Sequence, residues 1–88
     1  MNKIFSDKAW EDWMFWSVND KKIARKIHKL MSDIERNGAE KGIGSPEALK
    51  YDLAGLWSRE ITKKDRLVYR VDELGLHVYS CRGHYGDK

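Results

Sequence analysis

Hydrophobic side chains recur every three or four residues in the first half of the chain and at alternate positions in much of the second half. This pattern predicts helices followed by strands. The first helix is expected to begin after Ser6, whose hydroxyl suits a helix N-cap, and to run to about Val18. Trp10, Trp13 and Met14 fall on one face of this helix, and we expect that face to pack in the core.

A second helix is predicted from Lys21 to about Asn37, with Asp20 as its cap and Gly38 as its terminator. Its two faces differ sharply in character. The apolar stripe, about 100° wide, consists of Ile23, Ile27, Leu30, Met31 and Ile34. The basic face consists of Lys21, Lys22, Arg25, Lys26 and Lys29. Like charges this close destabilise one another by a few tenths of a kcal/mol per pair, which favours binding to a phosphate backbone over a merely solvated lysine face.

The stretch from Leu56 to Val71 predicts two strands joined by a turn at residues 62–65, after a candidate first strand at Lys3 to Phe5. With Ile61 opposite Arg66, one face of the hairpin carries Trp57, Arg59, Ile61, Arg66, Val68 and Arg70. A second turn at residues 72–75 extends this face with His77, Tyr79 and Cys81, and delivers His84 and Tyr85 just beyond its end. The opposite face is predicted to be the core, with Leu67, Tyr69, Val71, Leu76 and Val78.

Two arginines on the predicted polar face, Arg66 and Arg70, have no evident acidic partner there. A guanidinium group presents a planar fork of donors that suits phosphate, and like charges held together without a ligand are destabilising. Anion binding therefore explains an arrangement that stability alone does not. Arginines on a solvated strand face are also common, so the residues by themselves leave both interpretations open.

The 88 residues predict one small domain, residues 1–88. The formal net charge is +3 and its excess lies in the second helix, so nucleic acid is a candidate partner. Cys81 is the sole cysteine, which excludes an internal disulfide and favours a cytoplasmic location. The sequence has no signal peptide and no apolar run of ~20 residues, so we expect neither secretion nor membrane insertion. Its histidines and cysteine form no zinc pattern, and we expect no metal or other cofactor.

Four motifs, in their order and spacing, resemble the YoeB toxins of the RelE superfamily. They are Pro46-Glu47-Ala48-Leu49-Lys50, Leu53-Ala54-Gly55-Leu56-Trp57-Ser58-Arg59, Asp65-Arg66-Leu67-Val68-Tyr69 and Cys81-Arg82-Gly83-His84-Tyr85. The similarity includes the Trp-rich first helix and so covers nearly the whole chain. It implies an α+β fold, in which two N-terminal helices pack on a twisted, mostly antiparallel sheet, RelE-like and similar to microbial ribonucleases.

The resemblance also implies a function. Members of that family are toxins of type II toxin-antitoxin systems, ribosome-dependent endonucleases that cut messenger RNA in the A site of the bacterial ribosome. A YefM-type antitoxin neutralises them. The family's general base then falls on Glu47, its phosphate-binding arginine on Arg66, its general acid on His84 and its terminal tyrosine on Tyr85. Two further positions that line the site in relatives, and are expected to bind RNA, are Lys50 and Arg59.

These residue types suit the reaction. Cleaving RNA with its own 2′-hydroxyl requires a base for that proton, cations for the charge that grows on the phosphate, and an acid for the departing oxygen. The sequence departs from the family pattern beside the site, with Glu60 for an arginine, Asp65 for a histidine, Ala48 for a proline and Gly83 for a larger residue. We expect these changes to affect binding strength and base preference.

Two alternatives stay open. If it is not such an endonuclease, the chain is either a non-catalytic basic module that binds RNA or DNA, or a degenerate toxin that retains only antitoxin binding. A carboxylate such as Glu47 among the phosphate contacts argues against the first, because it repels the ligand. Whether the free protein is a homodimer is also left open by the sequence.

Overall fold

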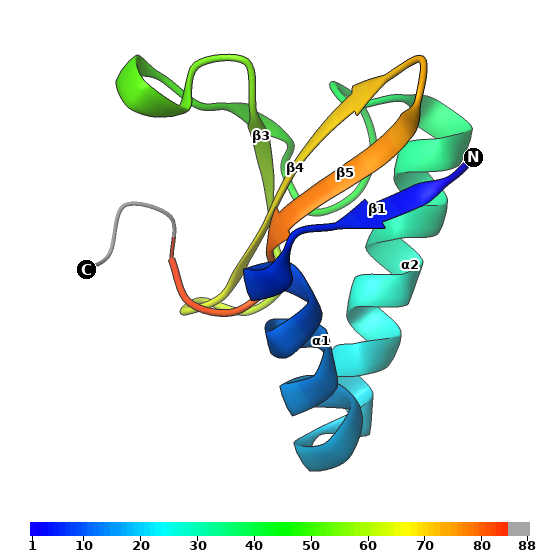
Figure 1. Ribbon diagram of the computed structural model, residues 1–88, viewed down its shortest axis with the longest axis vertical. Helices are drawn as coiled ribbons and strands as arrows, with labels where there is room; N and C mark the ends of the chain where they lie inside the picture. The colour runs from blue at the N-terminus through cyan, green and yellow to red at the C-terminus, as the bar shows by residue number, and fades with distance from the viewer. Residues whose placement is uncertain (85–88) are drawn as a thin grey trace.

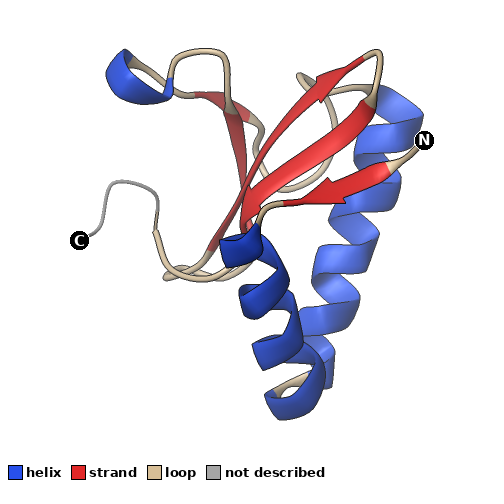
Figure 2. Ribbon diagram, in the orientation of Figure 1, coloured by secondary structure: helices blue, strands red, loops and turns tan. Residues whose placement is uncertain are grey.

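The computed structural model describes residues 1–84, in which two helices pack against one face of a five-stranded sheet (Figure 1, Figure 2). The strands are β1 (Lys3–Phe5), β2 (Glu47–Ala48), β3 (Trp57–Glu60), β4 (Arg66–Asp72) and β5 (Gly75–Ser80). The helices are α1 (Asp7–Asn19) and α2 (Lys21–Asn37), and a single 3-10 turn, η1, spans Tyr51–Leu53. The strand order is β1-β5-β4-β3-β2, with β1 parallel to β5 and the other neighbours antiparallel. The expected fold class is confirmed.

Both helices begin at the predicted caps. The Ser6 hydroxyl accepts a hydrogen bond from the Ala9 N–H at 3.0 Å, and the Asp20 carboxylate accepts from the Lys22 N–H at 3.1 Å. Gly38 ends α2 with a φ of 89°, a left-handed conformation that favours glycine. Neither helix is long and apolar enough to cross a membrane.

The apolar and basic faces of α2 lie as predicted. Four residues of the apolar stripe are buried, Ile27, Leu30, Met31 and Ile34, and the fifth, Ile23, is half-buried. Residues of β4 and β5 complete this core, namely Leu67, Tyr69, Leu76 and Val78. All five members of the basic face are exposed.

The buried side of α1 differs from the prediction. Ala9 and Trp16 are buried, whereas Trp10 and Met14 are 53% and 45% exposed. The Trp16 indole N–H donates to the Cys81 carbonyl at 2.8 Å, a bond that holds this ring on the inner side of the helix. Because aromatic residues cover most of the circumference of α1, their spacing does not distinguish one face from the next.

Strand β3 pairs with β4 one residue away from the predicted register. Glu60 lies opposite Arg66, and the turn spans residues 61–65. A shift of one residue moves every side chain of a strand to the other face of the sheet. The side chains that face the helices are therefore Trp57, Arg59 and Ile61. Ser58 and Glu60 share the far face with Arg66, and the predicted place of Arg59 beside Arg66 is wrong.

A β-bulge corrects a second expectation. The register between β4 and β5 shifts between Val68 and Tyr69, where Tyr79 is the extra residue. Cys81, predicted on the face that carries the arginines, is turned toward the helices and is fully buried. Burial raises the pKa of the Cys81 thiol to about 12.

Arg59 is a charged side chain with no exposed surface. Each of its five N–H donors has an acceptor. Nε donates to the Tyr69 hydroxyl at 2.8 Å, Nη1 to Asp33 Oδ2 at 2.6 Å and the Ile43 carbonyl at 3.0 Å, and Nη2 to the carbonyls of Gly38 at 2.9 Å and Lys41 at 2.7 Å. A buried charge is tolerated when it is fully paired and hydrogen-bonded. Arg59 thereby fastens the loop of residues 38–44 to α2 and β3.

Two glycines allow this loop to approach Arg59 and Asp33. Gly42 and Gly44 have φ values of 124° and 81°. A Cβ atom on Gly42 would lie 1.7 Å from Asp33 Oδ2, and one on Gly44 would lie 2.8 Å from Leu30 Cδ2. Larger residues would displace the loop, which leads directly into β2.

Replacing Arg59 by methionine should lower the free energy of unfolding by about 3 to 5 kcal/mol, the range for removing one partner of a buried ion pair. The substitution removes the cationic partner of the Asp33 carboxylate, which keeps its bonds from Asn37 and the Ile43 N–H, and it removes the Arg59 donors of three backbone carbonyls. Urea denaturation measures the change, with Lys63→Met on the exposed turn as the control. A loss below about 1 kcal/mol, the size of one ordinary hydrogen bond, would contradict this role.

The same pair predicts a dependence of stability on pH. The Arg59 hydrogen bond is the largest of the effects that hold the pKa of Asp33 below its usual value. Because the pKa is lower in the folded state, this stabilisation is present above the pKa of the unfolded chain, about 3.9, and is lost as the pH falls through the folded value. Asp33→Asn should therefore destabilise the protein at pH 7, and its difference from the natural chain should shrink in acid. Denaturation of both proteins between pH 7 and pH 3 would show it, and a constant difference would count against it.

Candidate active site

The sheet face away from the helices carries a group of polar side chains, called here the site face. Its polar members are Glu47, Ser58, Glu60, Arg66, Arg70, His77 and Tyr79, and the apolar Val68 lies among them. Strand pairing aligns them, because Glu47 lies opposite Ser58 and Ser58 lies opposite Val68. Figure 1 shows the η1 segment and the last described residues projecting on the side away from α2.

Arg66 and Glu47 meet at the centre of the site face. Arg66 Nη2 donates to the Ser58 hydroxyl at 3.0 Å and lies 3.6 Å from Glu47 Oε1. The Arg66 side chain is only 16% exposed, whereas that of Glu47 is 56% exposed. The guanidinium is thus held by the sheet, and the carboxylate is presented to solvent beside it. The expectation that this arginine has no acidic neighbour is wrong.

Arg70 also has an acidic partner, Asp72. Its Nη1 lies 3.3 Å from Asp72 Oδ2, and its Nε donates to the Tyr79 hydroxyl at 3.2 Å. His77 Nε2 lies 2.8 Å from the other Asp72 oxygen. The hydrogen bond with His77 is the largest cause of the lowered pKa of Asp72, and the charge of Arg70 adds to it. Arg70 therefore belongs to a local ionic network.

His84 is brought to Arg66 by the backbone of the preceding residue. The Gly83 N–H donates to Asp65 Oδ1 at 2.8 Å, and the Arg66 N–H donates to the Gly83 carbonyl at 2.9 Å. His84 is exposed and follows immediately. The sheet thus gathers Glu47, Arg66 and His84 within one region, while Tyr85 lies outside the described residues.

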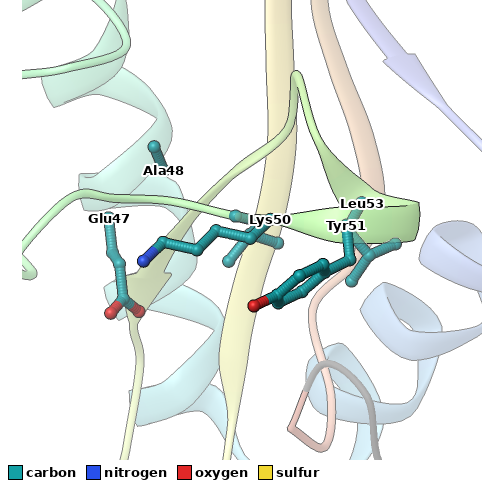
Figure 3. Close-up of a pocket in the computed structure, with 6 residues that line it drawn as sticks. Glu47, Ala48, Lys50, Tyr51 and Leu53 are labelled. Carbon is teal, nitrogen blue, oxygen red and sulfur yellow. The ribbon is translucent and has the colours of Figure 1, made fainter.

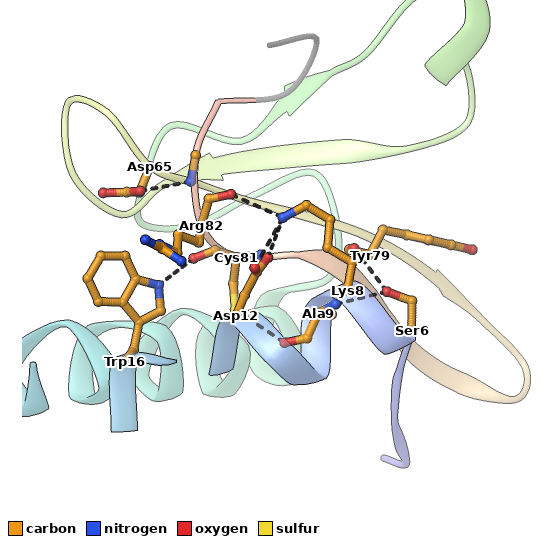
Figure 4. A network of polar contacts seen from close by, with 10 residues as sticks. Ser6, Lys8, Ala9, Asp12, Trp16, Asp65, Tyr79, Cys81 and Arg82 are labelled. Carbon is orange, nitrogen blue, oxygen red and sulfur yellow. Dashed lines mark hydrogen bonds and ion pairs between the residues drawn. The ribbon is translucent and has the colours of Figure 1, made fainter. Parts of the chain in front are cut away.

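Helix α1 holds the same terminal segment from the other side (Figure 4). The buried Asp12 carboxylate accepts from the Cys81 N–H at 2.9 Å and binds the Lys8 ammonium at 2.8 Å. The Arg82 guanidinium lies 3.5 Å from the centre of the Phe15 ring, a cation–π contact. The role of Asp12 was not predicted from the sequence, although its place four residues after Lys8 on an aromatic-rich helix indicates an ion pair on that helix.

The other predicted RNA-binding residues are distributed unevenly. Lys50 is exposed and lines a pocket together with Glu47 (Figure 3). Arg59 is buried between β3, α2 and the loop of residues 38–44, on the side of the sheet away from the site face. The basic face of α2 belongs to the helix side of the molecule, so the fold does not bring it together with Glu47. The predicted register placed Ser58 on the face opposite Arg66, whereas the structure places it on the site face.

Fold and site together define a small α+β protein in which a carboxylate and a shielded guanidinium pair on the helix-free side of a sheet, with a histidine on the segment bonded to that arginine's backbone. Residues 5–85 match the family model described as "YoeB-like toxin of bacterial type II toxin-antitoxin system". The chain is 45% identical over 85 residues to Toxin YoeB of Escherichia coli (strain K12), covering 97% of this chain and 100% of that protein. The chain belongs to the YoeB-like toxin family.

Solved structures agree with this assignment. A YoeB-YefM complex from Staphylococcus aureus matches with a TM-score of 0.91 and 46% identity, over 97% of this chain and 98% of the toxin chain. A YoeB dimer from the same organism matches with a TM-score of 0.91 and 47% identity, with the same coverage.

Asp65→Ala should loosen the segment that precedes His84, because it removes the acceptor of the Gly83 N–H. We expect that amide to exchange its hydrogen roughly 2- to 12-fold faster, the equivalent of a hydrogen bond worth about 0.5 to 1.5 kcal/mol. NMR-detected hydrogen exchange measures the rate. Asp65→Asn keeps an acceptor oxygen and serves as the control. Equal exchange rates in Asp65→Ala and the natural chain would show that this bond does not hold the segment.

Proposed function

We propose that this toxin is a ribosome-dependent endoribonuclease that cuts messenger RNA in the ribosomal A site. The observation that supports the proposal most is the pairing of Glu47 with Arg66 on the site face, beside the segment that carries His84. The Arg66 guanidinium lies 3.6 Å from Glu47, and its backbone is bonded to the residue before His84. A binding module gains nothing from a solvent-facing carboxylate beside its phosphate-binding arginine, whereas a catalyst needs a base there.

The proposed reaction is an internal transfer of the phosphoryl group. Glu47 takes the proton of the RNA 2′-hydroxyl, and the 2′-oxygen bonds to the adjacent phosphorus. The bond from phosphorus to the 5′-oxygen breaks as His84 gives that oxygen a proton. Arg66 and Lys50 hold the charge that grows on the phosphate. The products are a 2′,3′-cyclic phosphate and a 5′-hydroxyl, and no metal ion enters the balance. Tyr85 is assigned to orienting the nucleotide.

Docking is assigned to the basic face of α2, whose five side chains are exposed on the helix side. Binding to ribosomal RNA through that face leaves the site face directed toward the message. The ribosome would then position the substrate, a contribution that is worth several orders of magnitude in rate when the geometry is right. Such an enzyme acts in the cytoplasm. Arg59, being buried, has no part in RNA binding.

A YefM-like antitoxin is the proposed protein partner, since the S. aureus relative was solved in complex with YefM. An acidic segment that folds on binding would neutralise the Arg66 region or displace the residues that carry His84. A homodimer is the proposed form of the free toxin, as in the S. aureus dimer.

His84→Gln should cut message roughly 100- to 10,000-fold more slowly while binding ribosomes normally, because losing a general acid affects the chemical step alone. Single-turnover cleavage on programmed ribosomes measures the rate, and sedimentation measures binding. His77→Gln, a histidine already paired with Asp72, is the matched control and should retain its rate. A ribosome-bound His84→Gln protein that cuts at close to the natural rate would defeat the assignment of the acid. If the natural chain cuts no message on ribosomes, the proposed reaction is wrong and the chain is a non-catalytic binder.

Reversing the charge of Lys22, Lys26 and Lys29 to glutamate should weaken ribosome association by roughly two orders of magnitude or more, with an unchanged fold. The natural chain should also bind less tightly as salt rises, because each phosphate contact releases counterions. Lys41→Glu, on the 38–44 loop, controls for a general effect of surface charge. Unaltered sedimentation of the triple variant with ribosomes would reject docking through this face.

A further inference from the structure

A pocket of about 310 Å³ adjoins the proposed general base (Figure 3). Its lining consists of Glu47, Ala48, Leu49, Lys50, Tyr51 and Leu53. The volume is at the small end of the range for ligand sites, roughly 300 to 1,000 Å³, and suits a planar group smaller than most drugs. The proposed reaction uses Glu47 and Lys50 but gives no role to Tyr51, the aromatic residue beside them.

Tyr51 is held in an unusual conformation. Its φ is 57°, in the left-handed region that tyrosine rarely adopts, and its side chain is 92% exposed. A strained residue in this region costs about 1 to 3 kcal/mol, and a ring this exposed recovers almost nothing through burial. Strain of this kind is typical of ligand-binding segments. The turn that imposes it is anchored by the buried Leu49, whose N–H donates to the Leu56 carbonyl at 2.9 Å.

We propose that Tyr51 forms a stacking platform for the base of a nucleotide next to the scissile phosphate. An exposed aromatic ring offers a flat face on which any nucleobase can stack, and the Lys50 ammonium beside it can hold the phosphate or a base oxygen. Leu53 supplies an apolar wall. Arg66, the proposed target of an acidic antitoxin segment, does not line this pocket, whereas the exposed Glu47 carboxylate does. A planar, largely uncharged base therefore fits the pocket better than an acidic side chain. This inference rests on the proposed function for the position of the RNA.

The informative variant is Tyr51→Gly. Glycine accepts a φ of 57° without strain, so the variant should fold at least as stably as the natural chain, and lost binding cannot be attributed to unfolding. Tyr51→Trp keeps a stacking face, and Tyr51→Leu keeps apolar bulk without one. Trp10→Leu removes another exposed aromatic ring, on α1 at the opposite side of the sheet, and is the matched control.

Short RNA oligonucleotides, 2′-O-methylated to prevent cleavage, are the probe, and fluorescence anisotropy measures their binding to the free protein. Tyr51→Gly and Tyr51→Leu should bind roughly 5- to 150-fold more weakly, the range for loss of one base stacked on an aromatic ring. Tyr51→Trp and Trp10→Leu should bind like the natural chain. Within a series of oligonucleotides that each lack one base, a single position should make Tyr51→Gly and the natural chain bind equally.

Each result decides the matter. Equal binding of the natural chain and Tyr51→Gly would overturn the platform, as would no binding of RNA by the natural chain. A loss that persists with every abasic oligonucleotide would overturn it too, because the ring would then act on something other than a base. Weaker binding only of an acidic peptide would reassign Tyr51 to a protein partner. If message on ribosomes is never cut and the Tyr51-dependent binding remains, the proposed reaction fails, and Tyr51 stands as a base-stacking residue of an RNA-binding site without catalysis.

Discussion

Arg59 has no contact with solvent, and its guanidinium group can be stable there only while all five N–H donors are bonded. Asp33, Tyr69 and three backbone carbonyls meet that requirement. Because β3 must turn Arg59 toward these partners, its alternate residues, Ser58 and Glu60, must face the other way. The buried ion pair therefore determines which side chains stand beside Arg66.

The same bonds determine where the loop of residues 38–44 runs. This loop leads into β2, and the Glu60 N–H donates to the Gly44 carbonyl at 2.7 Å as the loop passes β3. Glu47 then pairs with Ser58 and reaches the Arg66 guanidinium. The second half of the site depends on a different set of bonds, those that join the residue before His84 to the start of β4. Two independent supports thus converge on Arg66.

Local signals predicted most of the fold. The caps at Ser6 and Asp20 and the terminator Gly38 fixed both helices, because each acts within a few residues of its own position. The register of β3 was predicted wrongly because a short strand with alternating large and polar residues fits either register. An arginine is also expected to be exposed unless its acceptors, which are distant in the sequence, are known. The buried side of α1 and the bulge at Tyr79 likewise depend on partners remote in sequence. The motifs alone suggested Glu47, Arg66 and His84 as candidates, whereas the role proposed for Tyr51 rests on its φ and exposure in the structure.

The chemical ends of cut message test the proposed reaction most directly. Attack by the 2′-hydroxyl leaves a 2′,3′-cyclic phosphate on one fragment and a 5′-hydroxyl on the other, whereas attack by water on the 3′-side bond leaves a 3′-hydroxyl and a 5′-phosphate. Message recovered from ribosomes treated with the toxin can be labelled by polynucleotide kinase, with and without prior phosphatase treatment. Direct labelling of the downstream fragment is the predicted result. Downstream fragments that accept label only after phosphatase treatment would contradict a site in which Glu47, Arg66 and His84 transfer the phosphate to the 2′-oxygen.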